Sequence, residues 1–124
     1  MSEQDRRAEL ARLVIQILDD WEVEPEDQPK LLGLPDKTRA RALNRYRQGD
    51  PLPDDAATEQ RLSYLLSIQK ALQTVLPHNA AMTRYWVTSP NPRFANRSPL
   101  DVMLANGLAG MEQVVEVLTG RGEW

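Results

Sequence analysis

The chain has 124 residues, of which 41% are hydrophobic and 27% are charged, so its composition is that of a folded protein rather than a disordered one. It has no cysteine, which excludes disulfides and thiolate metal sites, and no apolar run approaches the ~20 residues that a membrane-spanning helix needs. The net charge of −3 conceals a basic segment: residues 36–49 carry five bases and one acid, whereas residues 1–35 carry nine acids and four bases. With a polar N-terminus as well, we expect a cytoplasmic protein with no membrane contact.

The first predicted helix covers residues 3–21, where apolar residues recur at three- and four-residue spacing and form one stripe. The members of this stripe are Leu10, Leu13, Val14, Ile17, Leu18 and Trp21. A short second helix is expected over residues 27–32, with Asp27 as its cap, Pro29 in its first turn and Gly33 directly after its end.

The third predicted helix covers residues 37–48 and begins after Asp36, a favourable N-cap. Two helices joined by a short turn that contains glycine are typical of a helix-turn-helix. The outer face of the third helix has residue types that contact phosphates and base edges. The candidate DNA-binding residues are Lys37, Arg41, Asn44 and Arg45. An ordinary solvated basic face explains the same pattern, and the sequence leaves both interpretations open.

Residues 49–55 contain two prolines and three acids, which predicts a stiff, non-helical linker. We therefore expect an N-terminal part, residues 1–52, and a C-terminal part, residues 53–124. The fourth predicted helix, residues 56–76, is apolar over more than half of its circumference, which indicates the axis of the core or, second, a surface for self-association. The fifth, residues 79–88, has Met82, Tyr85 and Trp86 at helical spacing, which predicts a core face.

An irregular loop is predicted after Trp86, because Pro90 and Pro92 cannot lie inside a helix. Ser98 and Pro99 then predict a helix start, with serine as N-cap and proline in the first helical position. The last two predicted helices cover residues 99–106 and 111–118 and are separated by a turn from Gly107 to Gly110. The expected fold is all-α, with about seven helices, in which Trp86 packs against Phe94.

The sequence contains no motif that predicts catalysis. There is no phosphate-binding loop, no dinucleotide fingerprint, no zinc-protease helix and no nucleophile elbow. The one histidine has no matched nucleophile, and no cysteine is present. We therefore expect a binding protein, with no enzyme activity, no cofactor and no metal site.

One motif in the loop carries a family resemblance. The pattern N-P-x-F-x-x-x-S-P-L-D, which runs from Asn91 to Asp101, resembles the C-terminal toxin-binding domain of the Xre/MbcA/ParS antitoxin family. The resemblance extends back through residues 61–77 and to the helix-turn-helix-like segment at residues 31–35, so it covers most of the chain. The family often has glycine near the positions of Ala95 and Asn96, where this chain has none.

The resemblance implies an antitoxin of a type II toxin–antitoxin system. Its partner would be a RES-domain toxin that consumes NAD, and the antitoxin would block the active site of that toxin. Members of the family form homodimers within larger toxin–antitoxin assemblies, and some repress their own operon, which implies binding to operator DNA. The alternative is a stand-alone helix-turn-helix transcriptional regulator without a toxin.

The resemblance and the chemistry of the loop together give the candidate toxin-binding residues. Those that match the motif either shape the loop or face the partner, whereas Arg93, Arg97 and Trp124 are chosen because their side chains suit direct contact. The full set is Trp86, Asn91, Pro92, Arg93, Phe94, Arg97, Ser98, Pro99, Asp101 and Trp124.

Overall fold

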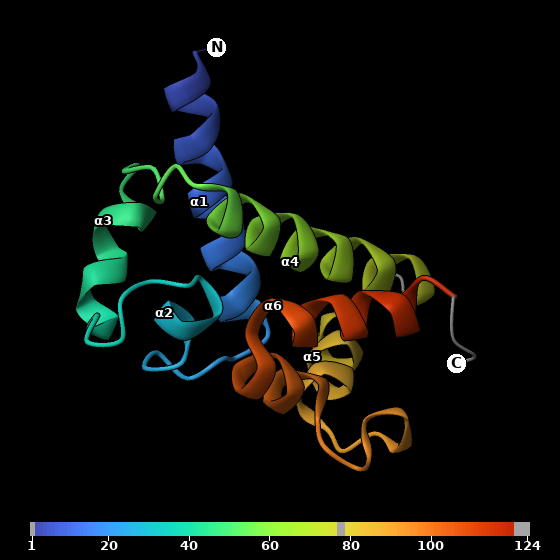
Figure 1. Ribbon diagram of the computed structural model, residues 1–124. Coiled ribbons are helices and arrows are strands. Elements are labelled where there is room, and N and C mark those ends of the chain that lie inside the picture. Colours follow the sequence, from blue (N-terminus) through green and yellow to red (C-terminus); the bar gives the residue numbers. More distant parts are fainter. Residues whose placement is uncertain (1, 77–78, 121–124) are drawn as a thin grey trace. The chain divides into compact units, whose positions relative to one another are not determined.

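The computed structural model describes residues 2–76 and 79–120. Over these residues the fold is all-α, as predicted, with six α-helices, two 3-10 helices and one isolated β-bridge in place of strands (Figure 1). The chain forms two compact units, residues 1–62 and 63–124. The division that we predicted at the linker, between residues 52 and 53, stays a prediction.

The first unit is built on α1, Glu3–Asp20, which begins where the hydroxyl of Ser2 accepts a hydrogen bond from the amide of Asp5 at 3.1 Å. Its buried face is formed by Ala8, Ala11, Val14, Ile15, Ile17 and Leu18. Trp21 is also buried, as predicted, but the prediction was wrong for Leu13, which is 50% exposed. Ala8, Ala11 and Ile15, which the predicted stripe did not include, complete the buried face.

Two short helices pack near α1 in this unit. They are α2, Gln28–Leu31, and α3, Leu43–Arg47, which follows the 3-10 helix η1, Ala40–Ala42. Gly33 ends α2 with a φ of +72°, as expected for the residue after a helix C-cap. An ion pair of 3.1 Å between Arg47 Nη2 and Asp19 Oδ1 joins α3 to α1.

The predicted helix over residues 37–48 was wrong in its first turn. The amide of Thr38 donates to the carbonyl of Pro35 at 2.9 Å, which closes a turn, and Arg39 has extended backbone. Asp36 therefore caps no helix, and regular α-helix begins only at Leu43. The local turn at Pro35 uses the amide that a helix cap would have needed.

The linker is non-helical, as predicted, and the carbonyl of Leu52 accepts a hydrogen bond from Arg7 Nη2 at 2.7 Å. After it, α4, Ala56–Val75, begins where the amide of Thr58 donates to Asp55 Oδ1 at 2.7 Å. This helix runs from the first unit into the second. Its fully buried residues are Leu65, Ile68 and Leu72.

The second unit continues with α5, Ala80–Thr88, the 3-10 helix η2, Pro92–Phe94, and α6, Pro99–Leu118. The two helices predicted over residues 99–118 are the halves of α6, which is kinked at Gly107, where φ is 59° and ψ is −131° (Figure 1). The halves approach so closely that a Cβ at Gly110 would collide with the backbone of Val102. Glycine is therefore needed at both positions, for conformation at Gly107 and for space at Gly110.

Candidate functional site

The candidate site starts at α5, whose orientation differs from the prediction. Asn79 caps this helix by accepting from the amide of Met82 at 3.0 Å. The buried side chains are those of Thr83 and Val87, whereas Met82 is 44% and Tyr85 is 64% exposed. The expectation of a core face was therefore wrong for Met82 and Tyr85, whereas Trp86 is half-buried. The smaller, β-branched side chains pack inward, and Met82 and Tyr85 are left at the surface.

The loop after α5 is closed by Asn91. Its side-chain Oδ1 accepts from the amide of Arg93 at 2.9 Å, and its backbone amide donates to the carbonyl of Arg97 at 3.1 Å. Between these bonds, η2 makes one tight turn, and Ala95 and Asn96 have φ values of 55° and 66°. Asn tolerates this left-handed backbone well, whereas Ala adopts it at a cost that the hydrogen bonds of the loop must offset.

Phe94 packs against Trp86 of α5, as predicted. Its side chain is 3% exposed, and its ring meets that of Trp86 edge-to-face, with centroids 6.4 Å apart and planes at 82°. Such a pair adds about 0.5–1.5 kcal/mol to the free energy of burial.

The end of the loop is the predicted helix start. Ser98 is buried, and its hydroxyl accepts from the amide of Asp101 at 3.0 Å, with Pro99 in the first turn of α6. The carboxylate of Asp101 lies in the first turn, where the helix dipole favours negative charge. The loop is thus fixed at both ends by side-chain caps.

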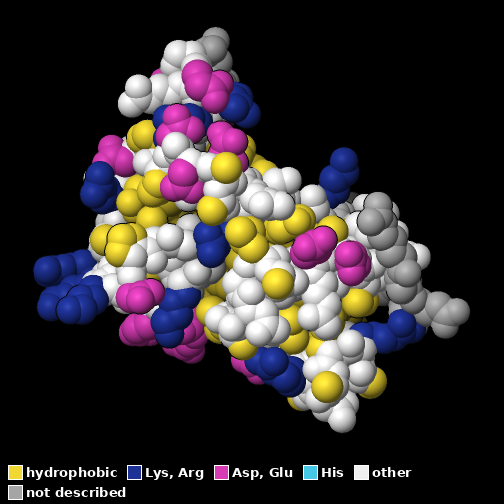
Figure 2. Space-filling model, in the orientation of Figure 1, with side chains coloured by type: hydrophobic (Ala, Val, Ile, Leu, Met, Phe, Trp, Pro, Cys, Tyr) yellow, Lys and Arg dark blue, Asp and Glu magenta, His cyan; other side chains and the backbone are white. Residues whose placement is uncertain are grey.

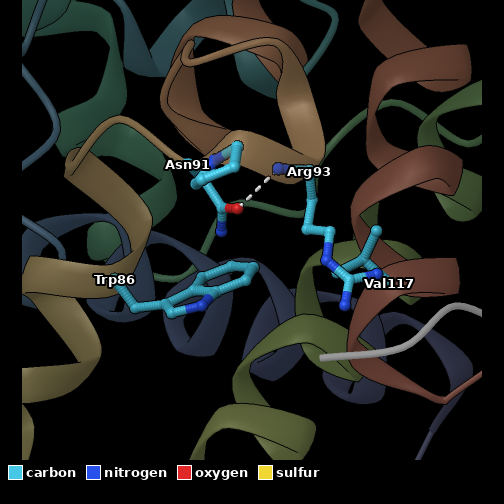
Figure 3. A pocket seen from close by; sticks show the side chains of 5 residues that line it. Trp86, Asn91, Arg93 and Val117 are labelled. Atoms are coloured by element: carbon cyan, nitrogen blue, oxygen red, sulfur yellow. Dashed lines mark hydrogen bonds between the residues drawn. The ribbon is translucent and has the colours of Figure 1, made fainter.

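An open hollow of about 240 Å³ lies between the loop and α6. It is lined by Trp86, Asn91, Pro92, Arg93 and Val117. Figure 3 shows the indole of Trp86 on one side and the guanidinium of Arg93 on another, beside Val117. The structure therefore brings four of the predicted site residues to one cavity.

Comparison with known proteins agrees with the motif. Residues 71–121 match the antitoxin Xre/MbcA/ParS C-terminal toxin-binding domain, and this range includes the whole loop and α6. The chain is also 35% identical over 102 residues to the uncharacterized protein y4oB of Sinorhizobium fredii, a match that covers 82% of this chain and 75% of that protein. Residues 71–121 of this chain are therefore a toxin-binding domain of the Xre/MbcA/ParS antitoxin type. The loop, the hollow and α6 are thus parts of its toxin-binding domain.

The remaining predicted residues of this domain differ in their surroundings. Arg97 is exposed but tethered, since its Nη2 donates to the carbonyl of Asp101 at 3.1 Å. Phe94, Ser98 and Pro99 are buried and hold the loop in shape. Trp124 lies outside the described residues.

The predicted DNA-binding residues do not lie along one helix. Lys37 is in the turn before α3, Arg41 is in η1, and Asn44 and Arg45 are in α3. Arg45 forms an ion pair with Asp50, in which Nε and Oδ2 are 3.2 Å apart. Its guanidinium lies over the ring of Tyr46. Figure 2 shows basic side chains projecting where α3 and the preceding loop lie, with acidic side chains close to them. The prediction that these residues form one basic face on a single helix was therefore wrong. DNA binding itself stays a prediction.

Sequence reasoning missed Val117, which lines the hollow from the second half of α6. The signal was present: Gly107 and Gly110 permit a sharp kink and a close approach, which fold the end of α6 back toward the loop.

Within residues 2–76 and 79–120 no three acids or histidines gather in a possible metal site. Over the same residues, no helix combines the length and the apolar character that crossing a membrane requires.

Proposed function

We propose that this chain is the antitoxin of a type II toxin–antitoxin system, and that it binds a RES-domain, NAD-consuming toxin and blocks its active site. The observation that carries the proposal is the match of residues 71–121 to the family's toxin-binding domain, with the Asn91–Asp101 motif intact. NAD is a cytoplasmic metabolite, so the pair would act in the cytoplasm.

The geometry of the loop supports a binding role. Both ends of the loop are capped by hydrogen bonds within this chain, and the side chain of Phe94 is buried. A loop that already has its bound shape loses little conformational entropy on association, which favours tight binding. Exposed Tyr85 and the partly exposed Trp86 adjoin the loop and are of the residue type that dominates protein interfaces.

The experiment is to co-express this chain with the RES-domain protein encoded beside it, purify the complex and measure consumption of NAD. We expect a stable complex in which NAD is spared, while the toxin alone depletes it. A matched control is Lys70→Ala, which removes one exposed cation on α4 outside the loop and should still protect NAD. If the wild-type chain forms no complex and does not slow NAD loss, the proposal is wrong.

A second proposed activity is binding to operator DNA, either as autorepression by the antitoxin or as the whole function of a stand-alone regulator. It is favoured by Lys37, Arg39 and Arg41, which are exposed and form no ion pair with any described residue. A regulator would bind DNA upstream of its own gene and leave NAD consumption by the neighbouring protein unchanged.

We also propose that the chain forms a homodimer. Sedimentation of the free chain would test this, and a strict monomer would exclude it.

A further inference from the structure

We infer that the hollow between the loop and α6 is a receptor for one acidic side chain of the toxin, whose carboxylate is bound by Arg93 and Asn91. This inference rests on the proposed function and deepens it, because it names the chemistry of the partner at one position. It commits to a carboxylate on a partner protein, and not to a free nucleotide or a second copy of this chain.

Arg93 is available for such a contact. Its backbone amide is bonded to Asn91, but its guanidinium makes no ion pair or hydrogen bond with any of the residues described. A second hollow, of about 200 Å³ and lined by residues of α1 and Arg47, is different, because there Arg47 is already paired with Asp19 at 3.1 Å. Of these two hollows, the one beside the loop has a cation that is available to an external anion.

The polar groups of the hollow are donors. Because Asn91 Oδ1 accepts from the amide of Arg93, the side-chain NH₂ of Asn91 is left to donate, and in Figure 3 it points to the space above Trp86. The guanidinium of Arg93 adds several more donors, in a fork that matches a carboxylate. A ligand that brings a donor would leave these groups unsatisfied, whereas a carboxylate satisfies both.

The charge around the hollow favours the same ligand. Residues 79–100 contain three arginines and no acid, although the whole chain has a net charge of −3. The loop side of the hollow is therefore positive and favours an acidic partner group over a basic one, whereas the acids Asp101, Glu112 and Glu116 lie on α6. Tyr85 and Met82 are exposed on α5, the helix that also carries Trp86, and they add apolar surface to that helix.

The size of the hollow and its apolar walls indicate a side chain rather than a cofactor. At about 240 Å³ the hollow is smaller than the ~300–1,000 Å³ of pockets that enclose drug-sized ligands. Trp86, Pro92 and Val117 form walls against which the methylene groups of a glutamate can pack. The carboxylate would then reach Arg93 and Asn91 at the rim.

The first test measures the affinity of the full chain for the RES-domain toxin by calorimetry, with Arg93→Ala, Arg97→Ala and Lys70→Ala as single variants of equal charge change. We expect Arg93→Ala to raise Kd at least about 30-fold, the lower end of the loss on removing one partner of a buried, hydrogen-bonded charge pair. Arg97→Ala should cost less, because its guanidinium is tethered to Asp101, and Lys70→Ala should leave Kd unchanged. Equal losses in all three would overturn the inference in favour of a general charge effect.

The second test identifies the group that enters the hollow. Arg93→Lys places an amine at the rim, and a zero-length carbodiimide reagent then joins that amine to any carboxylate in contact with it. Mass spectrometry of the treated complex should find residue 93 linked to an aspartate or glutamate of the toxin. A link to an acid of this chain, a link to a second copy, or no link at residue 93 would each overturn the inference.

The two proposals fail in different ways. If the wild-type chain protects NAD but Arg93→Ala binds as tightly as wild type, the antitoxin role stands and the carboxylate receptor is wrong. If the wild-type chain does not bind the toxin, both are wrong. Circular dichroism and thermal unfolding of each variant would show that exposed Arg93 can be replaced without loss of fold.

Discussion

Ala95 is held in a left-handed conformation, with φ 55° and ψ 39°, that is unfavourable for any residue with a Cβ. This conformation costs about 1–2 kcal/mol for an L-residue, whereas glycine adopts it freely but loses about 0.5–1 kcal/mol through its more flexible unfolded state. We therefore expect Ala95→Gly to raise the free energy of unfolding by about 0.5–1 kcal/mol. Urea denaturation at 25 °C would measure it.

The matched control is Ala105→Gly, at an exposed position inside α6. There the backbone is helical, so the same substitution should lower the free energy of unfolding by about 1 kcal/mol. Opposite signs at the two positions would show that the strain at Ala95 is real. A loss at Ala95 as large as that at Ala105 would contradict the prediction.

At the scale of the element, α6 depends on Gly107. Its φ of 59° and ψ of −131° lie in a region that residues with a Cβ essentially never occupy. Gly107→Ala should lower the free energy of unfolding by about 1–3 kcal/mol, and it should also weaken toxin binding because Val117 would leave the hollow. Chemical denaturation and calorimetry with the toxin would measure the two effects.

A useful control for Gly107 is Gly120, which also has positive φ, +85°, but has open space around it. Gly120 lies after the last turn of α6, where local fraying limits the effect of any strain on global stability. Gly120→Ala should therefore cost much less. Similar losses at both positions would show that the kink is not what makes Gly107 necessary.

The start of α4 makes stability depend on pH. The amide of Thr58 donates to the carboxylate of Asp55 at 2.7 Å, which holds the pKa of that carboxyl below the usual value of an aspartate. Because the folded-state pKa is below the unfolded one, Asp55 stabilises the fold at pH values above the unfolded pKa. This contribution is lost as the pH falls through the folded pKa.

The matched variant is Asp55→Asn, which keeps a capping oxygen but cannot ionise. Wild type should exceed Asp55→Asn in the free energy of unfolding at neutral pH, and the difference should shrink as the pH is lowered through the acidic range. Urea denaturation of both proteins from pH 7 downward measures this. A difference that stays constant with pH would show that the charge of Asp55 contributes nothing.

The elements differ in how far the sequence predicts them, and the reason is the range of the forces involved. The capped start of α6 at Ser98 and the irregular loop before it were predicted, because a side-chain-to-backbone hydrogen bond and two prolines, all local features, determine them. The inward face of α5 was predicted wrongly. Aromatic spacing identifies an apolar stripe, but whether Val87 or Tyr85 faces inward depends on packing against α6, which is distant in sequence.

The same distinction applies to the site. The motif located the loop and predicted the contact of Trp86 with Phe94, since both features are local. The motif ends before Val117, and although Gly107 and Gly110 indicated a turn, they did not indicate that this turn brings Val117 to the hollow. The motif also could not show that Arg93 and Arg97 differ in availability. Arg97 donates to the carbonyl of Asp101, whose position depends on the start of α6, whereas the guanidinium of Arg93 has no such bond among the described residues.

At the scale of the whole molecule, charge distribution decides whether this protein can bind DNA. The chain has a net charge of −3, so any DNA contact must come from a local basic segment, and residues 36–49 carry five bases and one acid. Arg45 is already paired with Asp50 and Arg47 with Asp19. Lys37 and Arg41 are exposed and have no such pair among the described residues, so they are the cations to test.

We predict that Lys37→Glu combined with Arg41→Glu weakens binding to the DNA upstream of the gene. If each side chain neutralises one phosphate, the slope of log K against log salt concentration should fall in magnitude by about 0.9 per contact, because fewer counterions are released. Fluorescence anisotropy over a range of salt concentrations measures affinity and slope together. The control is Lys70→Glu combined with Arg84→Glu, which changes the net charge equally in the second unit. If both pairs reduce binding alike, DNA senses only the net charge, and if neither does, residues 37–41 form a solvated basic surface without a role in DNA recognition.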